Sequence, residues 1–190
     1  TIDKKLKTMA AYQIGWCLYN LRKEKEAFEA FDAFIKNYPD SPLVADVRYW
    51  FGEYFRSKGK LDKAKEYFGS ILKDFPGSMT DETLKQLALI LLEEGKPAEA
   101  ISKFEEIADR YPGSDSALSA YRKIANIKKE AGDFTGAIEY YKKALTADNN
   151  EPNAQTQYEI AESYESGGDL RMAAEEYLKV PYLYPNGTFW

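Results

Sequence analysis

Apolar residues along the chain recur at three- and four-residue steps, the spacing of one face of an α-helix. In the segment 61–74, Ala64, Phe68, Ile71 and Leu72 follow this spacing. Charged residues stand between and beside them, at Lys63, Lys65, Glu66 and Lys73. Similar segments alternate along the chain with short polar stretches that contain glycine or proline. The pattern predicts an all-helical protein built from amphipathic helices and short turns.

The arrangement repeats every 36 or 37 residues, as the spacing of a recurring alanine shows: Ala27, Ala64, Ala100, Ala137 and Ala173. A small residue precedes each alanine by twelve positions, and Phe or Tyr follows it by four. Such a period indicates one supersecondary unit used repeatedly. We expect five helical hairpins, at about 8–44, 45–80, 81–117, 118–153 and 154–190, in a single array. The small residues should let helices cross closely, and the aromatics should fill the space between neighbouring hairpins.

Serine, proline and glycine mark the expected helix ends. In the second unit, helices should run from about 42 to 58 and from 61 to 74. Ser41, Ser78 and Ser114 are expected N-caps of the helices that follow them, and Pro42 should occupy the first helical position. Gly59 should end the first helix of that unit.

Composition narrows the classes of function. The chain has 190 residues, 44% of them apolar and 30% charged, with a formal net charge of −5. This mild acidity argues against nucleic-acid binding, which usually needs a basic domain. The single cysteine, Cys17, excludes an intrachain disulfide, and histidine is absent. The longest wholly apolar run, Leu87–Leu92, is too short to cross a bilayer.

Carboxylate pairs at Glu93–Glu94, Glu105–Glu106 and Glu175–Glu176 are the nearest approach to catalytic chemistry. Adjacent helical residues diverge by about 100°, so such a pair does not converge on one substrate atom. We therefore expect these pairs to be solvated helix surface. Because no nucleophile–base pair, phosphate-binding loop or metal spacing appears, we expect a protein that is not an enzyme and that binds no cofactor or metal.

The repeated positions resemble the tetratricopeptide repeat family. The second unit carries them as Phe51-Gly52, Phe55, Ala64, Phe68, Ile71 and Pro76, and the other units supply most equivalents. The resemblance implies a right-handed α-solenoid that serves as a non-catalytic scaffold for protein–protein interaction. The turns Tyr-Pro-Asp-Ser, Phe-Pro-Gly-Ser and Tyr-Pro-Gly-Ser look like the bacterial cell-envelope branch, which includes the TolA-binding periplasmic protein and BamD-like lipoproteins. A periplasmic or envelope location is thus favoured over the cytoplasm.

Members of the family bind partner segments on the concave face, made by the first helix of each hairpin. Carried onto this chain, that face gives the candidate residues Tyr12, Trp16, Tyr49, Trp50, Lys85, Arg122, Lys123, Asn126 and Lys129. The N-terminal half is aromatic, with Trp50 preferred over Tyr12 and Trp16, and the fourth unit is basic. The alternatives are that the aromatics pack between helices and that the charges are merely solvated.

The basic residues of the fourth unit match part of a carboxylate clamp known in chaperone-binding members. Arg122 and Asn126 occupy two clamp positions, but Glu159 stands where the clamp needs an amide. The expected partner is an extended or helical protein segment, and the basic residues favour an acidic one. We expect no nucleic-acid partner and no membrane insertion. Self-association and a role as the recruiting or regulatory arm of a larger enzyme are the alternatives.

The two ends of the sequence suggest a fragment of a longer chain. It begins at Thr1 without Met and finishes on Phe189-Trp190, two apolar aromatics where repeat arrays need a polar cap. The fourth unit carries Asn149 where other units have proline, so its boundary is the least regular.

Overall fold

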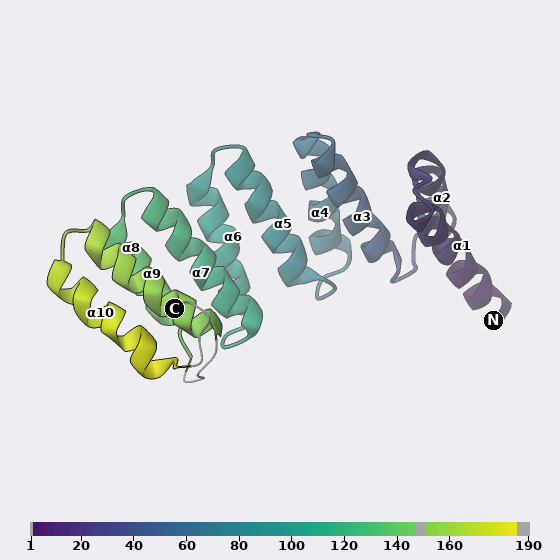
Figure 1. Ribbon diagram of the computed structural model, residues 1–190. Coiled ribbons are helices and arrows are strands. Elements are labelled where there is room, and N and C mark those ends of the chain that lie inside the picture. The colour runs from purple at the N-terminus through teal and green to yellow at the C-terminus, as the bar shows by residue number, and fades with distance from the viewer. Residues whose placement is uncertain (1, 147–150, 186–190) are drawn as a thin grey trace. The chain divides into compact units, whose positions relative to one another are not determined.

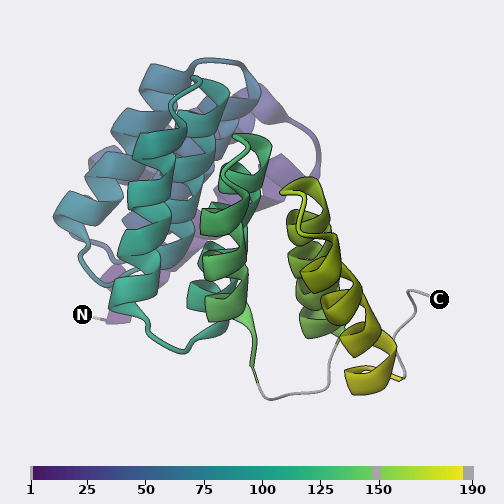
Figure 2. The same ribbon diagram turned by 90° about the vertical axis from the view of Figure 1, so that its left-hand side faces the viewer.

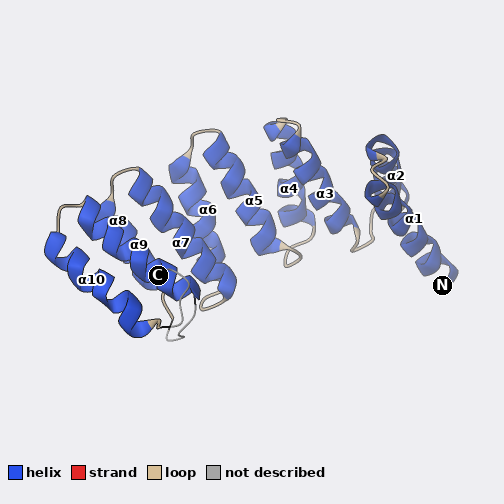
Figure 3. Cartoon of the chain, viewed as in Figure 1, coloured by secondary structure: helices blue, strands red, loops and turns tan. Residues whose placement is uncertain are grey.

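The computed structural model describes residues 2–146 and 151–185, which leaves the expectations on Asn149, Phe189 and Trp190 outside the described residues. Within that part of the chain every regular element is a helix, which confirms the all-α prediction (Figures 1 and 3). The helices are α1 (Ile2–Asn20), α2 (Glu24–Asn37), α3 (Val44–Ser57), α4 (Leu61–Asp74), α5 (Thr80–Glu93), α6 (Pro97–Arg110), α7 (Asp115–Glu130), α8 (Phe134–Ala144), α9 (Glu151–Ser166) and α10 (Leu170–Leu183).

The chain divides into two compact units, residues 1–83 and 84–190, with the division falling within α5. In the first unit α1 packs on α2 and α3 on α4, and α2 also contacts α3. In the second unit α7 packs on α8 and α9 on α10, and α6·α7 and α8·α9 contacts join successive hairpins. Figure 2 shows the last hairpin, with yellow α10 beside α9.

The repeated alanine and aromatic positions form the core of the hairpins. The alanines at 27, 64, 100 and 137 are fully buried, and Ala173 is 3% exposed. A Cβ at Gly52 would lie 2.5 Å from the Phe68 ring, so the small residue permits the close crossing that the sequence predicts. Phe31 lies against Gly15 in its own hairpin and also 4.8 Å from the Trp50 ring in the next one. The aromatic therefore fills space within a hairpin as well as between hairpins.

Of the three expected serine caps, only Ser114 is confirmed. Its hydroxyl accepts a hydrogen bond from the Ala117 backbone N–H at 3.1 Å at the start of α7. The expectations for Ser41, Pro42 and Ser78 are wrong. Helix α3 begins at Val44 with Leu43 before it, because the residues after Ser41 form a turn. Helix α5 begins at Thr80, one residue later than Ser78 would allow.

The turn within each hairpin uses one backbone conformation. Gly59, Gly95, Gly132 and Gly168 occupy equivalent repeat positions, and all have φ between +69° and +85°. Glycine suits this left-handed region because it has no Cβ. The first hairpin has Arg22 at the equivalent position, with φ +58°, so it places a residue with a Cβ where the other four hairpins have glycine.

Candidate partner-binding site

Lys129, from the last turn of α7, lies between two carboxylates of α9. Its ammonium is 2.7 Å from Glu159 and 2.8 Å from Glu162. Partial burial opposes the charged form of Lys129, but the hydrogen bonds that its ammonium donates to the two carboxylates, together with their negative charge, outweigh the burial and raise the Lys129 pKa. The lysine that the sequence assigns to a basic stripe is therefore already paired, and two carboxylates share one ammonium.

Tyr141 of α8 extends this network beneath the surface. Its ring is 1% exposed, and its hydroxyl donates to Asn126 Oδ1 and lies 3.4 Å from Glu159 Oε2. Burial, followed by the charge of Glu159, raises the Tyr141 pKa well above its usual value. Asn126 is thereby fixed by a buried phenol, which orients its amide on the α7 surface.

A hollow open to solvent lies over this network in the second unit. It has a volume of about 480 Å³ and is lined by Asn126, Lys129, Glu130, Phe134, Glu159 and Ser166. The charged residues that line the hollow are Lys129, Glu130 and Glu159, and Glu162 pairs with Lys129. Three carboxylates therefore surround one ammonium. The excess negative charge favours a cationic group from a ligand over an anionic one.

Arg122 and Lys123 present the opposite charge two turns earlier on α7. Arg122 is half-buried and Lys123 is exposed, and neither forms an ion pair within the described residues. Lys85, at the equivalent repeat position of α5, is exposed. The face of α7 thus runs from unpaired cations at Arg122 and Lys123 to a carboxylate-rich end beside Glu159.

The candidate aromatics of the first unit take part in packing. Trp50 is 5% exposed and contacts the rings of Tyr19, Phe31, Phe51 and Tyr54. The structure thus places Trp50 between helices, which is the alternative that the sequence left open.

The other three candidate aromatics of that unit are half-buried. The Tyr12 hydroxyl donates to Asp46 at 3.2 Å, and the Trp16 ring packs on Tyr12. Tyr49 lies 5.3 Å from the Phe68 ring. Each of these side chains therefore has intramolecular contacts to hold it, and a partner would meet only part of its surface.

Three tetratricopeptide repeat family models match the chain, at residues 9–41 and 46–78, 80–150, and 122–188. Together they cover nearly all of it.

The chain belongs to the tetratricopeptide repeat family.

Relatives and solved structures agree with this assignment. Tetratricopeptide repeat protein 8 of Mus musculus is 31% identical over 148 residues, which are 70% of this chain and 28% of that protein. The chain thus spans less than a third of this curated relative. BtubC (BKLC) from P. vanneervenii has a similar fold, with a TM-score of 0.71 at 16% identity over 96% of this chain and 83% of that one. The MamA protein gives 0.69 at 18% identity over 93% and 91%.

Tetratricopeptide repeats generally mediate protein–protein interaction and generally act as non-catalytic scaffolds. The described helices include none that is long and apolar enough to span a membrane. Within the same residues no cluster of His, Cys, Asp and Glu could hold a metal ion.

A buried polar cluster around Glu176 was not among the candidate residues that the sequence suggested. Glu176 is 4% exposed, accepts a hydrogen bond from Gln157 Nε2 at 2.5 Å, and pairs with Lys179 at 2.8 Å. The expectation that Glu175–Glu176 is solvated surface is therefore wrong for Glu176. The repeat register offered a signal, because Glu176 aligns with Tyr67 and Tyr140, which are half-buried.

The Glu105–Glu106 pair is also engaged rather than freely solvated. Glu105 accepts a hydrogen bond from the Tyr140 hydroxyl at 2.6 Å, which raises the pKa of Tyr140 to about 12. Glu106 forms ion pairs with Lys103 and Arg110. Glu105 thus joins α6 to α8, and Glu106 links successive turns of α6.

Proposed function

We propose that this chain binds an extended segment of a partner protein along α7 and the hollow beside α9. The segment carries an acidic side chain that meets Arg122 and Lys123, and a basic side chain that enters the hollow at Glu159 and Glu162. The observation that carries the proposal is the charge distribution on α7: unpaired cations at one end, and two carboxylates sharing one ammonium at the other.

Helix geometry sets the spacing of the two charges on the segment. Arg122 and Lys129 are seven residues apart and so lie on nearly the same side of α7, about 10 Å apart along its axis. An extended chain advances about 3.3 Å per residue. The acidic and basic residues of the partner should therefore be about three positions apart, as in Glu-x-x-Lys or its reverse.

Charge complementarity of this kind selects the partner more than it adds affinity. Exposed charge pairs contribute little to binding individually, but they speed encounter and exclude partners whose charges are mismatched. Salt weakens them because the Debye length falls to about 8 Å at physiological ionic strength. Because Lys129 is already paired with Glu159 and Glu162, only Arg122 and Lys123 are proposed to bind the acidic side chain of the partner.

A peptide array tests the proposal directly. The array displays one acidic and one basic residue in a neutral background, in both orders and at spacings from one to six. The labelled protein should favour the three-residue spacing in one order, and binding should weaken as salt is added. A response that depends only on net peptide charge, or that shows no preferred spacing, would refute the proposal.

Matched variants separate the two ends of the site. Arg122→Ala with Lys123→Ala should remove the dependence on the acidic peptide residue, and Glu159→Gln with Glu162→Gln should remove the dependence on the basic one. Lys60→Ala with Lys73→Ala, and Glu66→Gln with Glu99→Gln, make the same charge changes at exposed positions elsewhere. These controls should leave the preference unchanged.

The setting that we propose for this interaction is a bacterial cell-envelope assembly. The support is the turn (Tyr/Phe)-Pro-x-Ser, which follows α2, α4 and α6. The full-length reading frame tests it: a lipid-attachment or export signal ahead of the array supports the envelope setting. A fused catalytic domain would instead support the recruiting arm of an enzyme.

A further inference from the structure

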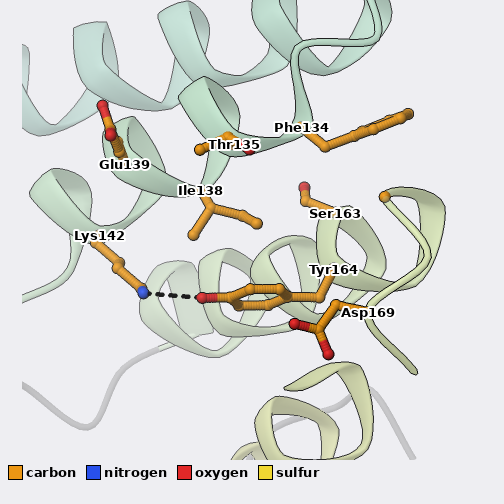
Figure 4. Close-up of a pocket in the computed structure, with 9 residues that line it drawn as sticks. Phe134, Thr135, Ile138, Glu139, Lys142, Ser163, Tyr164 and Asp169 are labelled. Carbon is orange, nitrogen blue, oxygen red and sulfur yellow. Dashed lines mark hydrogen bonds between the residues drawn. The ribbon is translucent and has the colours of Figure 1, made fainter. Parts of the chain in front are cut away.

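A cleft lies inside the second unit, between the start of α8 and the end of α9, and has a volume of about 300 Å³. The Tyr164 ring lies across it, with Ile138 on one side of the ring (Figure 4). The Lys142 ammonium donates to the Tyr164 hydroxyl at 3.1 Å, and Asp169 lies at the opposite end of the ring. Glu139 also lines the cleft, so its charged groups are two carboxylates and one ammonium. Both walls belong to successive hairpins, and neither end of the chain borders the cleft.

Asp169 lacks a lysine that its counterpart in the preceding hairpin has. That counterpart, Asp133, caps α8 by accepting a backbone N–H on Oδ1 at 2.9 Å, and its Oδ2 accepts from the Lys128 ammonium at 2.8 Å. Asp169 Oδ1 caps α10 in the same way, at 3.0 Å. At the repeat position of Lys128, however, the last hairpin has Tyr164. Asp169 therefore forms no ion pair within the described residues, and its second oxygen faces no lysine of its own hairpin.

The contact between α2 and α3 in the first unit shows a lysine in the corresponding place. Lys58 occupies the repeat position of Gly167. Its ammonium lies 3.0 Å from Glu24 of α2 and 5.3 Å from the centre of the Tyr54 ring. In the last hairpin Gly167 supplies no side chain, and Ser163 stands at the repeat position of Tyr54. The space that a lysine and an aromatic ring fill in the first unit is therefore left open between α8 and α9.

Both comparisons identify the missing group as an ammonium on a flexible apolar stem. Lysine covers apolar surface with its stem while its charged head stays at a polar group, and Ile138 and the Tyr164 ring offer such a surface. An ammonium beside a tyrosine ring also gains a cation–π attraction. The positive end of the α10 dipole opposes a cation beside Asp169. The equivalent end of α8 nevertheless accommodates Lys128 on Asp133, so this opposition does not exclude an ion pair there.

We propose that the cleft between α8 and α9 binds a lysine side chain of a partner protein. The stem lies along Ile138 and the Tyr164 ring, and the ammonium donates to Asp169 Oδ2. Lys142 repels a second ammonium from the hydroxyl end of Tyr164, so the lysine head lies at the Asp169 end. Acetylation of the partner's lysine removes its charge and should prevent binding. The inference does not depend on the segment proposed for α7, because it uses none of the charged residues that bind that segment.

A titration with single-residue probes, followed through the backbone amide signals in NMR spectra, tests the proposal. The probes are Nα-acetyl-lysine methylamide, the norleucine analogue that keeps the stem without the charge, and the Nε-acetyl-lysine analogue. The lysine probe should shift the amide signals of Gly167, Gly168 and Asp169. The two uncharged probes should bind on the order of tenfold more weakly, because they cannot form a hydrogen bond to a charged group.

Three variants locate the binding. Asp169→Asn keeps an N-cap oxygen, so helicity should not change, but it should weaken the lysine probe on the order of tenfold. Gly167→Lys places the chain's own lysine where the first unit has Lys58, and it should abolish binding. Gly167 does not have a positive φ, so its backbone accepts a side chain. The matched control is Asp133→Asn, which alters the same cap in the preceding hairpin and should leave the affinity unchanged.

Each comparison can overturn the proposal. A norleucine probe that binds as tightly as the lysine probe would show an apolar slot rather than a lysine site. Equal losses in Asp169→Asn and Asp133→Asn would show that the probe senses surface charge alone. Binding that survives Gly167→Lys, or a lysine probe that shifts no signal around Gly167, would exclude the cleft as the site.

Discussion

The first unit and the last hairpin share one repeat geometry, but different kinds of side chain are buried between their helices. In the first unit the helices meet through aromatic rings, and Phe31, Phe34, Phe51 and Phe68 are each at most 1% exposed. In the last hairpin polar side chains share the core with apolar ones such as Ile160 and Val180. The buried polar residues are Asn153, Thr156, Gln157, Ser163 and Glu176, all at most 4% exposed. Both regions keep the alanine that marks the repeat, at Ala27 and Ala173.

The difference teaches that the repeat fixes backbone geometry but leaves the kind of contact free. An aromatic contact is stabilised by the apolar area that it buries and loses stability in proportion to what is removed. A buried polar contact is asymmetric, because removing one member leaves its partner unsatisfied, whereas removing both can cost little. Substitutions in the two regions should therefore behave by different rules.

The largest expected effect is Phe51→Ala in the first unit. The Phe51 ring contacts Phe28, Trp50 and Tyr67 on three helices, so truncation should lower the free energy of unfolding by about 3–5 kcal/mol. Trp16 and Trp50 both lie in this unit, so tryptophan fluorescence during urea unfolding reports on it once Trp190 is replaced by Phe. Phe51→Leu should cost far less. Equal losses for the two variants would contradict packing as the cause.

Glu176 in the last hairpin tests the rule for polar contacts. Glu176→Ala should cost about 1–3 kcal/mol, because it strands the Gln157 amide. Replacing both residues by leucine, as Gln157→Leu with Glu176→Leu, should recover most of the lost stability or make the protein more stable than the parent. Far-UV circular dichroism should record these changes. A double variant that is less stable than Glu176→Ala would mean that the pair is not interchangeable with apolar packing.

Tyr141 should show a smaller effect with a distinct pH dependence. Tyr141→Phe removes the hydrogen bond to Asn126 and should cost about 1 kcal/mol at neutral pH. Because folding raises the Tyr141 pKa, the contribution is fully present below the unfolded pKa of about 10 and is lost as pH rises toward the folded pKa. The stability difference between parent and variant should therefore shrink above about pH 10. A difference that stays constant across that range would show that the phenol is not held in its protonated form.

Sequence reasoning predicted the backbone better than the chemistry of the site. The helix boundaries 61–74, the alanine register and the close helix crossing at the small residue Gly52 followed from spacing, because periodicity and residue size set them locally. The pairing of Lys129 with Glu159 and Glu162 did not, since it joins side chains of different hairpins thirty or more residues apart. Trp50 and Glu176 show the same limit: their burial depends on what neighbouring helices place against them.

The smallest expected effect is the stabilising substitution Arg22→Gly. The backbone at Arg22 has the left-handed conformation that four equivalent glycines adopt, and a Cβ there costs about 1–2 kcal/mol. Glycine also gives the unfolded chain more conformational freedom, which opposes folding by about 0.5–1 kcal/mol. The net stabilisation should therefore be about 0.5–1 kcal/mol. Tryptophan fluorescence of the first unit measures it, with Arg22→Ala as the control that removes the side chain but keeps the Cβ. If Arg22→Ala stabilises the unit as much as Arg22→Gly does, the charge rather than the backbone conformation is the cause.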